Sequence, residues 1–159
     1  MTNLVIRSCR AADKEHIKDL YKLASIHSEI GYRDGPWYTD LDDIEDFYFK
    51  GGDFLIGEIN GEIVAMVGLQ KITDTEAHIR RMRVHPEYRR KGYAQQLLNE
   101  LEMRAKQYGF TELRLRTSIQ QKMAQGFYEK NGYKKLATGK KEFYKEGPFE
   151  VIWYKKELT

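Results

Sequence analysis

The residues best suited to chemistry lie in the stretch RMRVHPEYRRKGYAQQLL, residues 81–98. A strand is predicted to end near Val84, a short turn passes Pro86, and a helix is predicted to open across six residues: Arg89, Arg90, Lys91, Gly92, Tyr93 and Ala94. The first-turn N–H groups of a helix have no internal acceptor and carry partial positive charge. Gly92 lets an anion approach that backbone without meeting a side chain, and three cations precede it. The stretch therefore predicts a binding site for a pyrophosphate group.

This anion-binding pattern belongs to neither of two common nucleotide-binding motifs, because the sequence contains no GxxxxGK[ST] and no GxGxxG. Taken alone, R-x-x-G-x-A is a common pattern, and a helix start with solvated arginines also explains it. Two features favour the functional interpretation. The pattern follows a strand and a turn and opens an amphipathic helix, and a second motif lies downstream between Gln121 and Tyr133.

The two motifs together resemble those of the GNAT superfamily of acyl-CoA-dependent N-acetyltransferases. Residues 82–94 (MRVHPEYRRKGYA) are similar to the motif with which that family holds the cofactor pyrophosphate, and residues 124–133 (AQGFYEKNGY) are similar to its second motif. Tyr128 follows Ala94 by 34 residues, a spacing typical of the family. The order of predicted elements fits from Leu4 to Lys156, so the resemblance covers nearly the whole chain.

The resemblance implies a role for each matching residue, with acetyl-CoA as co-substrate. Residues 89–94 would hold the pyrophosphate, largely through backbone N–H groups. Met82 and Val84 would pair with the pantetheine arm much as an added strand does, and a backbone N–H near Met82 would stabilise the oxyanion. Tyr128 would protonate or hydrogen-bond the departing thiolate, since a phenol is a donor at neutral pH. Gln121 stands where the family often has Asn and would contact the cofactor.

The general base is the residue that this resemblance leaves open, because it varies within the family. One version is a Glu on the strand before the pyrophosphate loop, and His78 falls at or near that place. A histidine with a pKa near 6.5 can accept an ammonium proton. Glu76 and Glu58 are alternatives, and a structural hydrogen bond is the more common role for a strand histidine. A bulge in this strand would change which side chains face the cleft, so alternation along it decides nothing.

The segment after the first predicted helix often borders the acceptor site in this family. Six aromatic residues lie there: Tyr32, Trp37, Tyr38, Phe47, Tyr48 and Phe49. Residues 40–46 contain five acids and no base. Carboxylates and aromatic faces attract cations, which suits a cationic amine acceptor. In the alternative interpretation, the aromatic residues pack a short helix against the sheet.

The elements around these motifs predict one mixed α/β domain over residues 1–159. Strands are expected at residues 4–7, 53–59, 62–72, 77–84, 113–117, 133–136 and 149–156, and helices at about 13–24, 39–48, 94–108 and 119–130. Asn60 and Gly61 suit a two-residue hairpin turn because both tolerate positive φ. Such hairpins exclude a purely parallel sheet. The expected fold is therefore a twisted, mainly antiparallel sheet flanked by helices.

Composition argues against several other classes of protein. Hydrophobic residues make up 41% of the 159 residues, enough for a core, and the net charge of +3 is too small to indicate nucleic-acid binding. The longest apolar run, residues 63–69, is far below the ~20 residues of a membrane span. The first residues lack a signal-peptide pattern, so a cytoplasmic location is expected. Cys9 is the lone cysteine, and no metal site is expected.

The sequence thus predicts an N-acetyltransferase that moves an acetyl group from acetyl-CoA to a primary amine on a small molecule or peptide. Attack would be direct, in a ternary complex, without metal, nucleic acid or membrane. The tail after Gly139 could exchange strands, which leaves a homodimer open. Two alternatives remain. One is an acyl-CoA-binding module without turnover, and the other is a small nucleic-acid-binding domain using residues 80–91, whose affinity would fall steeply with salt.

Overall fold

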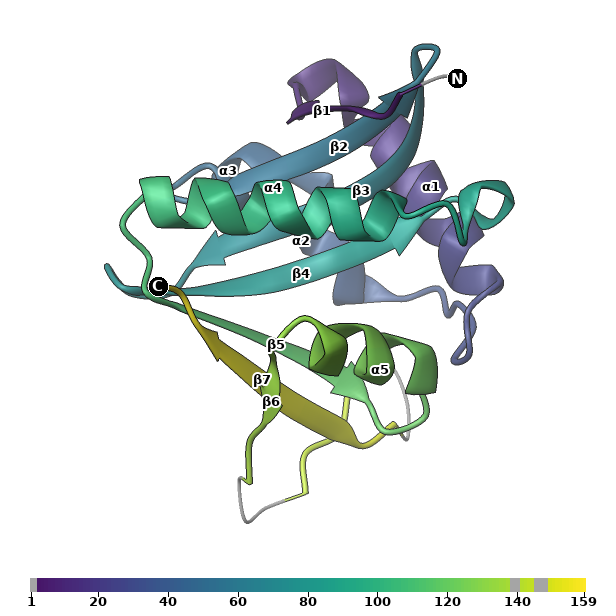
Figure 1. Ribbon diagram of the computed structural model, residues 1–159. Coiled ribbons are helices and arrows are strands. Elements are labelled where there is room, and N and C mark those ends of the chain that lie inside the picture. Colours follow the sequence, from purple (N-terminus) through teal and green to yellow (C-terminus); the bar gives the residue numbers. More distant parts are fainter. Residues whose placement is uncertain (1–2, 138–140, 145–148) are drawn as a thin grey trace.

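The computed structural model describes residues 3–137, 141–144 and 149–159. These residues form a seven-stranded sheet in the order β1-β2-β3-β4-β5-β7-β6 (Figure 1). The strands are β1 Val5–Ser8, β2 Asp53–Ile59, β3 Glu62–Lys71, β4 Glu76–Val84, β5 Glu112–Ser118, β6 Lys134–Lys135 and β7 Val151–Glu157. Neighbouring strands are antiparallel except β4 and β5, which are parallel. The expected mixed α/β fold with a mainly antiparallel sheet is confirmed.

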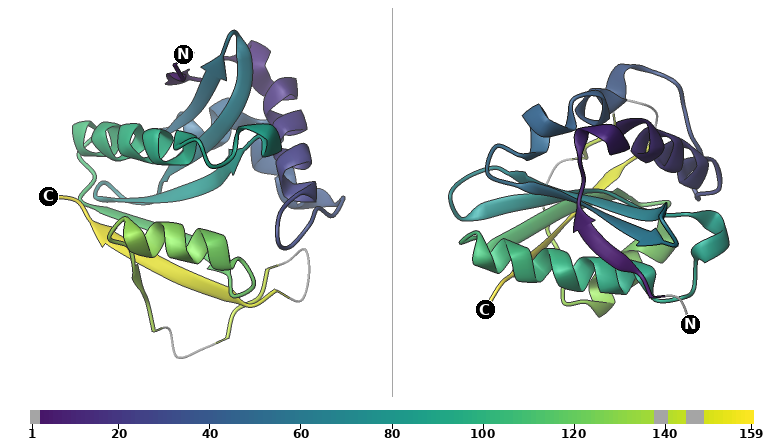
Figure 2. Two further views of the ribbon diagram at one scale, coloured as in Figure 1. Left: turned by 45° about the vertical axis from the view of Figure 1, so that its right-hand side comes forward. Right: turned by 90° about the horizontal axis from the view of Figure 1, so that it is seen from above.

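Helices cover both faces of this sheet (Figure 2). The helices are α1 Lys14–Ile26, α2 Thr39–Asp42, α3 Ile44–Tyr48, α4 Tyr93–Gln107 and α5 Lys122–Lys130, and 3₁₀ turns occur at Ala11–Asp13, Pro36–Tyr38 and Pro86–Tyr88. One face carries α1, α2 and α3, and the other carries α4 and α5 (Figure 2). The active-site residues predicted from the sequence therefore come from the central strand β4, from the loop that leads into α4, and from α5 on the same face as α4.

Each face of the sheet has its own hydrophobic core. Four apolar residues of α4 are fully buried against the sheet, at the helical spacing that the sequence shows: Leu97, Leu98, Leu101 and Ala105. Tyr108, counted in the same apolar stripe, instead lies past the end of the helix and is 45% exposed. On the other face, Ile17, Leu20, Tyr21 and Ala24 of α1 are buried. These two cores fix α1 and α4 on opposite sides of β4.

Local backbone chemistry explains where the elements begin and end. The β2–β3 turn has positive φ at Asn60 (51°) and Gly61 (79°), as the predicted tight hairpin requires. The helix expected over 39–48 is broken at Asp43, whose side chain instead accepts the N–H of Asp46 at the start of α3. The helix expected from 119 begins at Lys122, because the Ser118 hydroxyl accepts the N–H of Gln120 within a turn.

The predicted strand over residues 133–136 is shorter than expected, since only Lys134–Lys135 pair with β7. Gly139, where the tail that could exchange strands begins, lies outside the described residues, so dimerisation through that tail stays a prediction. None of the helices in the described part of the chain is long and apolar enough to cross a membrane.

Candidate active site

The site is built where β4 and β5 separate. The two strands are in register at Glu76–Glu112, Ala77–Leu113 and His78–Arg114, within the described residues. Beyond His78, β4 continues beside β3 to Val84, whereas β5 continues beside β7 to Ser118. Figures 1 and 2 show the strands diverging toward the end that carries α5 and the start of α4. One edge of β4 is therefore without a strand partner over its second half.

A β-bulge lies in this unpartnered half of β4. Gly68 of β3 faces Arg80, but Met66 faces Arg83, so β4 contains one extra residue between these pairs. Arg81 takes up the extra length with a φ of 59°. Because of the bulge, Arg80 and Arg81 both reach the helices of the α1 face, where strict alternation would send them to opposite faces. A bulge of the kind that prevented an assignment of strand faces from the sequence is therefore present in β4.

After Val84, the chain turns through residues 85–92 into α4. Gly92 precedes the helix with a left-handed backbone (φ 81°), and Arg90 is also left-handed (φ 63°). A Cβ built on Gly92 would meet nothing within 4 Å. Glycine is therefore favoured here by its backbone conformation and leaves open space above the turn.

The first backbone N–H groups of α4 have no acceptor within the helix. Its first helical hydrogen bond runs from Gln96 N to Gly92 O, so the amides of Tyr93, Ala94 and Gln95 lie in the uncapped first turn. Among the described residues no side chain caps this turn, and the turn contains no acid. Arg90 and Lys91 are exposed beside it. These groups match the chemistry of an anion-binding turn.

Not every cation of this loop faces the open turn. The Arg89 guanidinium donates to the carbonyls of His27 (2.8 Å) and Ala24 (3.0 Å), at the C-terminal end of α1. Lys91 lies 5.7 Å from the ring centroid of Tyr88. Arg89 therefore ties the loop to α1, and of the residues predicted to hold the pyrophosphate it would contribute only its backbone.

Met82 and Val84 lie on the unpartnered half of β4. Both are partly buried, and both pack against the core beneath α4. The carbonyl of Met82 accepts a hydrogen bond from Arg83 Nη1 (2.8 Å). The structure thus places these two residues on β4, one of the two diverging strands, immediately before the loop that leads into α4.

Tyr128 lies on α5, on the far side of the separation, with 7% of its surface exposed. Its ring contacts Phe127 and Tyr133 edge-on, at centroid distances of 5.2 and 5.5 Å. Burial raises the pKa of Tyr128, and the charge of Arg83 lowers it in part. None of the hydrogen bonds found among the described residues involves its hydroxyl.

Gln121 occupies the position before α5. Its Oε1 accepts hydrogen bonds from Thr117 Oγ1 (3.0 Å) and Ser118 N (2.9 Å), which fixes the amide against the end of β5. The amides of Lys122 and Met123, in the first turn of α5, donate to the carboxylate of Glu29 at 3.1 and 3.0 Å. The loop after α1 therefore reaches across to α5, a contact that the sequence did not indicate.

His78 lies at the last paired position of β4 and β5, four residues before Met82. Its Nε2 is 2.8 Å from Glu76 Oε2, and its ring lies 5.3 Å from that of Trp153. Burial lowers the pKa of His78, against the raising effect of Glu76. If the carboxylate accepts from Nε2–H, Nδ1 carries the lone pair. The structure shows no contact between His78 and Tyr128 among the described residues.

The two alternative bases are held by structural partners. Glu58 forms an ion pair with Arg7 at the β1–β2 edge of the sheet, three strands away from β5. Glu76 bonds to His78 and lies 3.7 Å from Arg114. Glu58 is thereby placed away from the separation of β4 and β5, and Glu76 is placed to orient His78.

Three of the five acids of residues 40–46 have a cationic partner among the described residues: Asp40, Asp42 and Asp46. Asp40 is buried, and Arg81 binds it through two hydrogen bonds of 2.8 and 3.0 Å. Burial alone would raise the pKa of Asp40, but the hydrogen bonds and charge of Arg81 lower it. Asp42 pairs with Lys18, and Asp46 pairs with Lys50. The hypothesis that these acids attract a cationic acceptor therefore receives no support, whereas the packing interpretation does: Tyr48 is fully buried.

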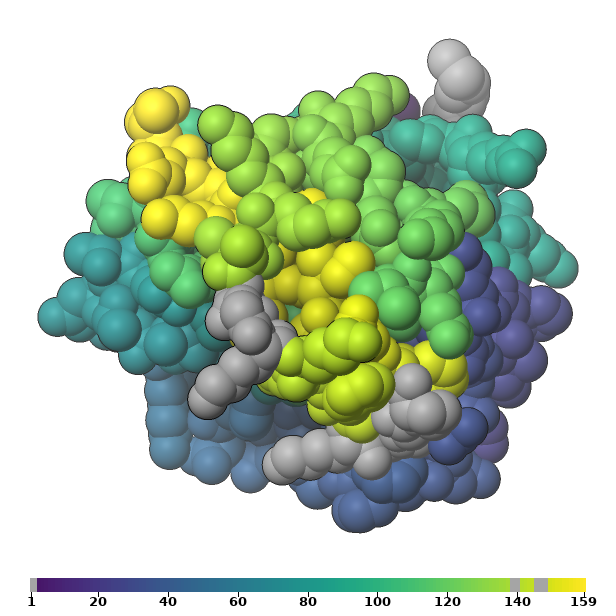
Figure 3. Space-filling model, turned by 90° about the horizontal axis from the view of Figure 1, so that it is seen from below, coloured from purple at the N-terminus to yellow at the C-terminus, as the bar shows by residue number. Residues whose placement is uncertain are grey.

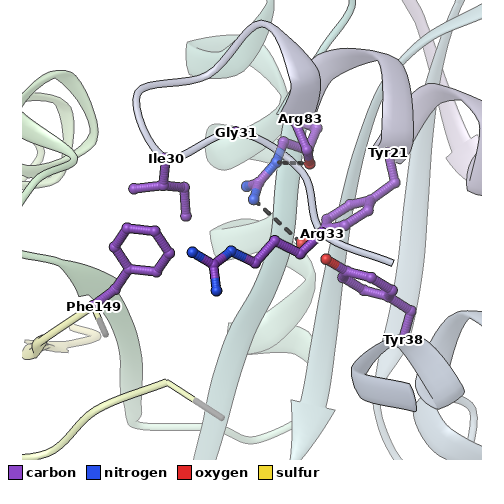
Figure 4. Close-up of a pocket in the computed structure, with 8 residues that line it drawn as sticks. Tyr21, Ile30, Gly31, Arg33, Tyr38, Arg83 and Phe149 are labelled. Carbon is purple, nitrogen blue, oxygen red and sulfur yellow. Dashed lines mark hydrogen bonds between the residues drawn. The ribbon is translucent and has the colours of Figure 1, made fainter. Parts of the chain in front are cut away.

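A small pocket lies beside the bulge, and sequence reasoning missed it. It is lined by residues of α1, the loop after α1, β4 and the segment before β7: Tyr21, Ser25, Ile30, Gly31, Arg33, Tyr38, Arg83 and Phe149 (Figure 4). Tyr21 accepts hydrogen bonds from Arg81 Nη1 (2.8 Å) and Arg83 Nη2 (3.3 Å). Burial would raise the pKa of Tyr21, but the charges of Arg83 and Arg81 lower it. The only sequence signal was the run of arginines, which does not reveal this partner.

The described residues contain no group of three or more His, Cys, Asp or Glu side chains arranged to hold a metal ion.

Comparison with known proteins gives a consistent result. The family model described as acetyltransferase (GNAT) family matches residues 17–133. N-acetyltransferase 8 of Homo sapiens is 31% identical over 119 residues, which cover 70% of this chain and 52% of that protein. The chain thus spans about half the length of this curated relative.

Two solved structures share the fold. A GNAT-family acetyltransferase from Staphylococcus aureus Mu50 superposes with a TM-score of 0.85 at 22% identity, covering 99% of this chain and 100% of that one. The PaiA N-acetyltransferase from Thermoplasma acidophilum, solved in complex with coenzyme A, has a TM-score of 0.76 at 21% identity, covering 97% and 99% of the two chains. At this level of identity the likeness shows the fold alone.

Proposed function

The chain belongs to the acetyltransferase (GNAT) family, and we propose that it transfers an acetyl group from acetyl-CoA to a primary amine. One observation carries the proposal. The second half of β4, which does not pair with β5, leads through residues 85–92 directly into the uncapped N-terminus of α4. An extended edge followed by an anion-binding turn suits a ligand with an amide-rich arm and a pyrophosphate.

The residues of the turn fit a pyrophosphate. The amides of the first turn of α4 supply donors, Gly92 leaves open space above them, and Arg90 and Lys91 supply charge. A carboxylate in this turn would argue against an anion, and the described first turn has none. We assign Arg90, Lys91, Gly92, Tyr93 and Ala94 to pyrophosphate binding, with Arg89 acting through its backbone.

The unpartnered edge of β4 would hold the pantetheine arm through the backbone of Met82 and Val84. Acetyl-CoA supplies an activated thioester, whose carbonyl oxygen gains negative charge during attack by the amine. A backbone N–H near Met82 would stabilise that charge, because fixed donors in a partly buried site need no reorganisation. Gln121, which uses only its Oε1 among the described residues, keeps its amide nitrogen for a further contact.

Tyr128 is assigned the role of the acid that assists thiolate departure. Its burial favours the neutral phenol, so the hydroxyl keeps its proton at neutral pH. A donor that remains protonated and has no hydrogen-bond partner among the described residues can give a hydrogen bond or a proton to a sulfur anion. The position of α5 across from Met82 and Val84 supports this role.

His78 is the residue that we propose to accept the amine proton. A primary amine with a pKa near 10 is mostly protonated at pH 7, so a proton must be removed before attack. The lowered pKa of His78 keeps the ring neutral at that pH. Glu76 holds Nε2 and leaves Nδ1 as the acceptor, directly or through water.

The test combines a binding and a turnover measurement on the whole chain. Acetyl-CoA should raise the melting temperature, and free thiol should appear only when a primary amine is added. Stabilisation without thiol release across a wide amine panel would favour an acyl-CoA-binding module without turnover. Absence of both stabilisation and thiol release would refute the proposed function.

A further inference from the structure

The pocket beside the β4 bulge has a basic lining. Its lining includes two arginines, Arg33 and Arg83, and no carboxylate among the described lining residues. In Figure 4, Arg83 and Arg33 both extend among the aromatic rings of Tyr21, Tyr38 and Phe149. The neighbouring Arg81, by contrast, is neutralised by the bidentate contact with Asp40. Of the neighbouring arginines on β4, Arg81 is therefore committed to Asp40, whereas Arg83 belongs to the pocket lining.

Arg83 is held in place but is not paired with an acid. Its Nη1 donates to the Met82 carbonyl at 2.8 Å, and its Cζ lies 4.8 Å from the ring centroid of Tyr21. The two contacts that face the pocket are long, at 3.3 Å each, to Ser25 Oγ and to the Tyr21 hydroxyl. Among the described residues it forms no ion pair. A planar guanidinium with weakly occupied donors is suited to bind a carboxylate through two hydrogen bonds.

Arg83 also connects the pocket to the proposed chemistry. It follows Met82 directly in β4, and its charge is near enough to Tyr128 to lower the pKa of that phenol. A group held by Arg83 therefore lies close to both the proposed oxyanion donor and the proposed acid. An acceptor anchored there has its amine only a few bonds from its anchored group.

We propose that the acceptor is an amino acid, whose carboxylate is bound by Arg83 and whose apolar or aromatic side chain lies against Ile30, Tyr38 and Phe149. This inference rests on the proposed function. The amine nitrogen forms a bond to the acetyl carbon, and the carbon–sulfur bond breaks. The protonated amine gives one proton to the base before attack, and the nitrogen releases a second proton to solvent as the amide forms. The thiolate takes a proton from Tyr128, which solvent then reprotonates, and the carboxylate stays unchanged on Arg83.

Entry of an acceptor requires a local movement. The cavity measures about 20 Å³, because the guanidinium of Arg33 lies across it, 5.6 Å from the centroid of Phe149. Arg33 is exposed on the loop after α1, and Phe149 belongs to the segment before β7. Figure 3 shows the C-terminal segments (yellow) beside the first third of the chain (purple to blue) on this side of the molecule. Separation of these two side chains would open the pocket to a side chain of the acceptor.

The experiment compares matched acceptors that differ only in the carboxylate. L-Phenylalanine, L-leucine and L-methionine are each assayed with acetyl-CoA beside their own carboxamides, by thiol release. We expect at least one acid to be preferred over its amide by tenfold or more in kcat/KM. The amide has the more easily deprotonated amine, so its intrinsic reactivity works against this result.

Two charge-matched variants locate the preference. Arg83→Gln should reduce the ratio of kcat/KM for the acid to kcat/KM for its amide to about twofold or less. Arg80→Gln removes the same charge from the same strand, but its guanidinium lies over Phe47, outside the pocket, so the ratio should be kept. The proposal would be overturned if the unaltered protein used every amide as well as its acid, or if the preference for the acid survived Arg83→Gln. In either case, thiol release would still support the proposed transferase activity.

A second measurement is independent of turnover. With coenzyme A present, N-acetyl-L-phenylalanine and its leucine and methionine counterparts are compared with their carboxamides in thermal unfolding. We expect stabilisation by at least one acid and not by its amide, lost in Arg83→Gln and kept in Arg80→Gln. If every N-acetyl acid and its carboxamide stabilise the protein equally, the carboxylate site is overturned, even if no acceptor is turned over. If acetyl-CoA itself does not stabilise the protein, the result counts against the proposed function instead.

Discussion

Replacing Gly92 by aspartate places a carboxylate at the N-terminus of α4, where the pyrophosphate is proposed to bind. A Cβ at this position would meet no protein atom within 4 Å, so the substitution creates no clash at the backbone. The backbone φ of 81° imposes a cost of roughly 1–2 kcal/mol on a residue with a Cβ. A negative charge at the start of a helix returns about 0.3–1 kcal/mol of that cost. The variant should therefore fold.

The loss in ligand binding should be larger than the loss in stability. At a concentration of 100 times Kd, acetyl-CoA stabilises the unaltered protein by about 2.7 kcal/mol. A domain of this size gains roughly 2–4 °C per kcal/mol, so the melting temperature should rise by about 5–11 °C. In Gly92→Asp the carboxylate repels the pyrophosphate and competes for the same amides. We expect this rise to disappear.

Gly61→Asp is the matched control for this measurement. Gly61 has a φ of 79°, a Cβ there would also meet nothing within 4 Å, and it lies in the β2–β3 hairpin. Gly61→Asp should lower the melting temperature of the free protein by a similar amount and keep the rise with acetyl-CoA. Thermal unfolding with and without acetyl-CoA gives both quantities. A full rise in Gly92→Asp would refute the assignment of this turn to the pyrophosphate.

Three further predictions test the other residues. Tyr128→Phe should lower kcat for thiol release roughly 100-fold and keep the thermal shift with acetyl-CoA, and an unchanged kcat would remove its role as acid. Arg81→Met should reduce the unfolding free energy measured with urea by about 3–5 kcal/mol, because Asp40 would be left buried without its cation, and a loss below 1 kcal/mol would contradict the proposed pairing. Since burial lowers the pKa of His78 and a base must be deprotonated, kcat/KM should fall with decreasing pH through an apparent pKa below about 6.5. His78→Gln should abolish that limb of the pH profile, and an identical profile would exclude His78 as the base.

Much of the fold could be predicted because its signals are local. Apolar spacing marked α1 and α4, and alternating or continuous apolar runs marked the strands. The turn at Asn60 and Gly61 was predicted because both residues adopt positive φ readily. The start of α5 was misplaced because Ser118 can end a strand or cap a helix, and pairing of β5 with β7 decides between these roles.

The candidate site was only partly predictable. The turn at Gly92 has its chemistry in consecutive residues, so the sequence identified it. The pocket around Tyr21 and Arg83 was missed because its residues are far apart in the chain, and they meet only through the register of β4 against β3. One extra residue in that register reverses which side chains face α1, and alternation along the sequence cannot reveal it.

The amino-acid sequence by itself predicted the open turn before α4 and the order of the elements, because backbone propensity and spacing act over a few residues; the candidate acid Tyr128 came from the resemblance to the family. Tertiary structure alone decided which charges remain available. Asp40 and Arg81 cancel each other across 41 positions, whereas Arg83, two residues further along the strand, meets no acid among the described residues. Electrostatic compensation depends on distance in space, and the bulge in β4 sets those distances.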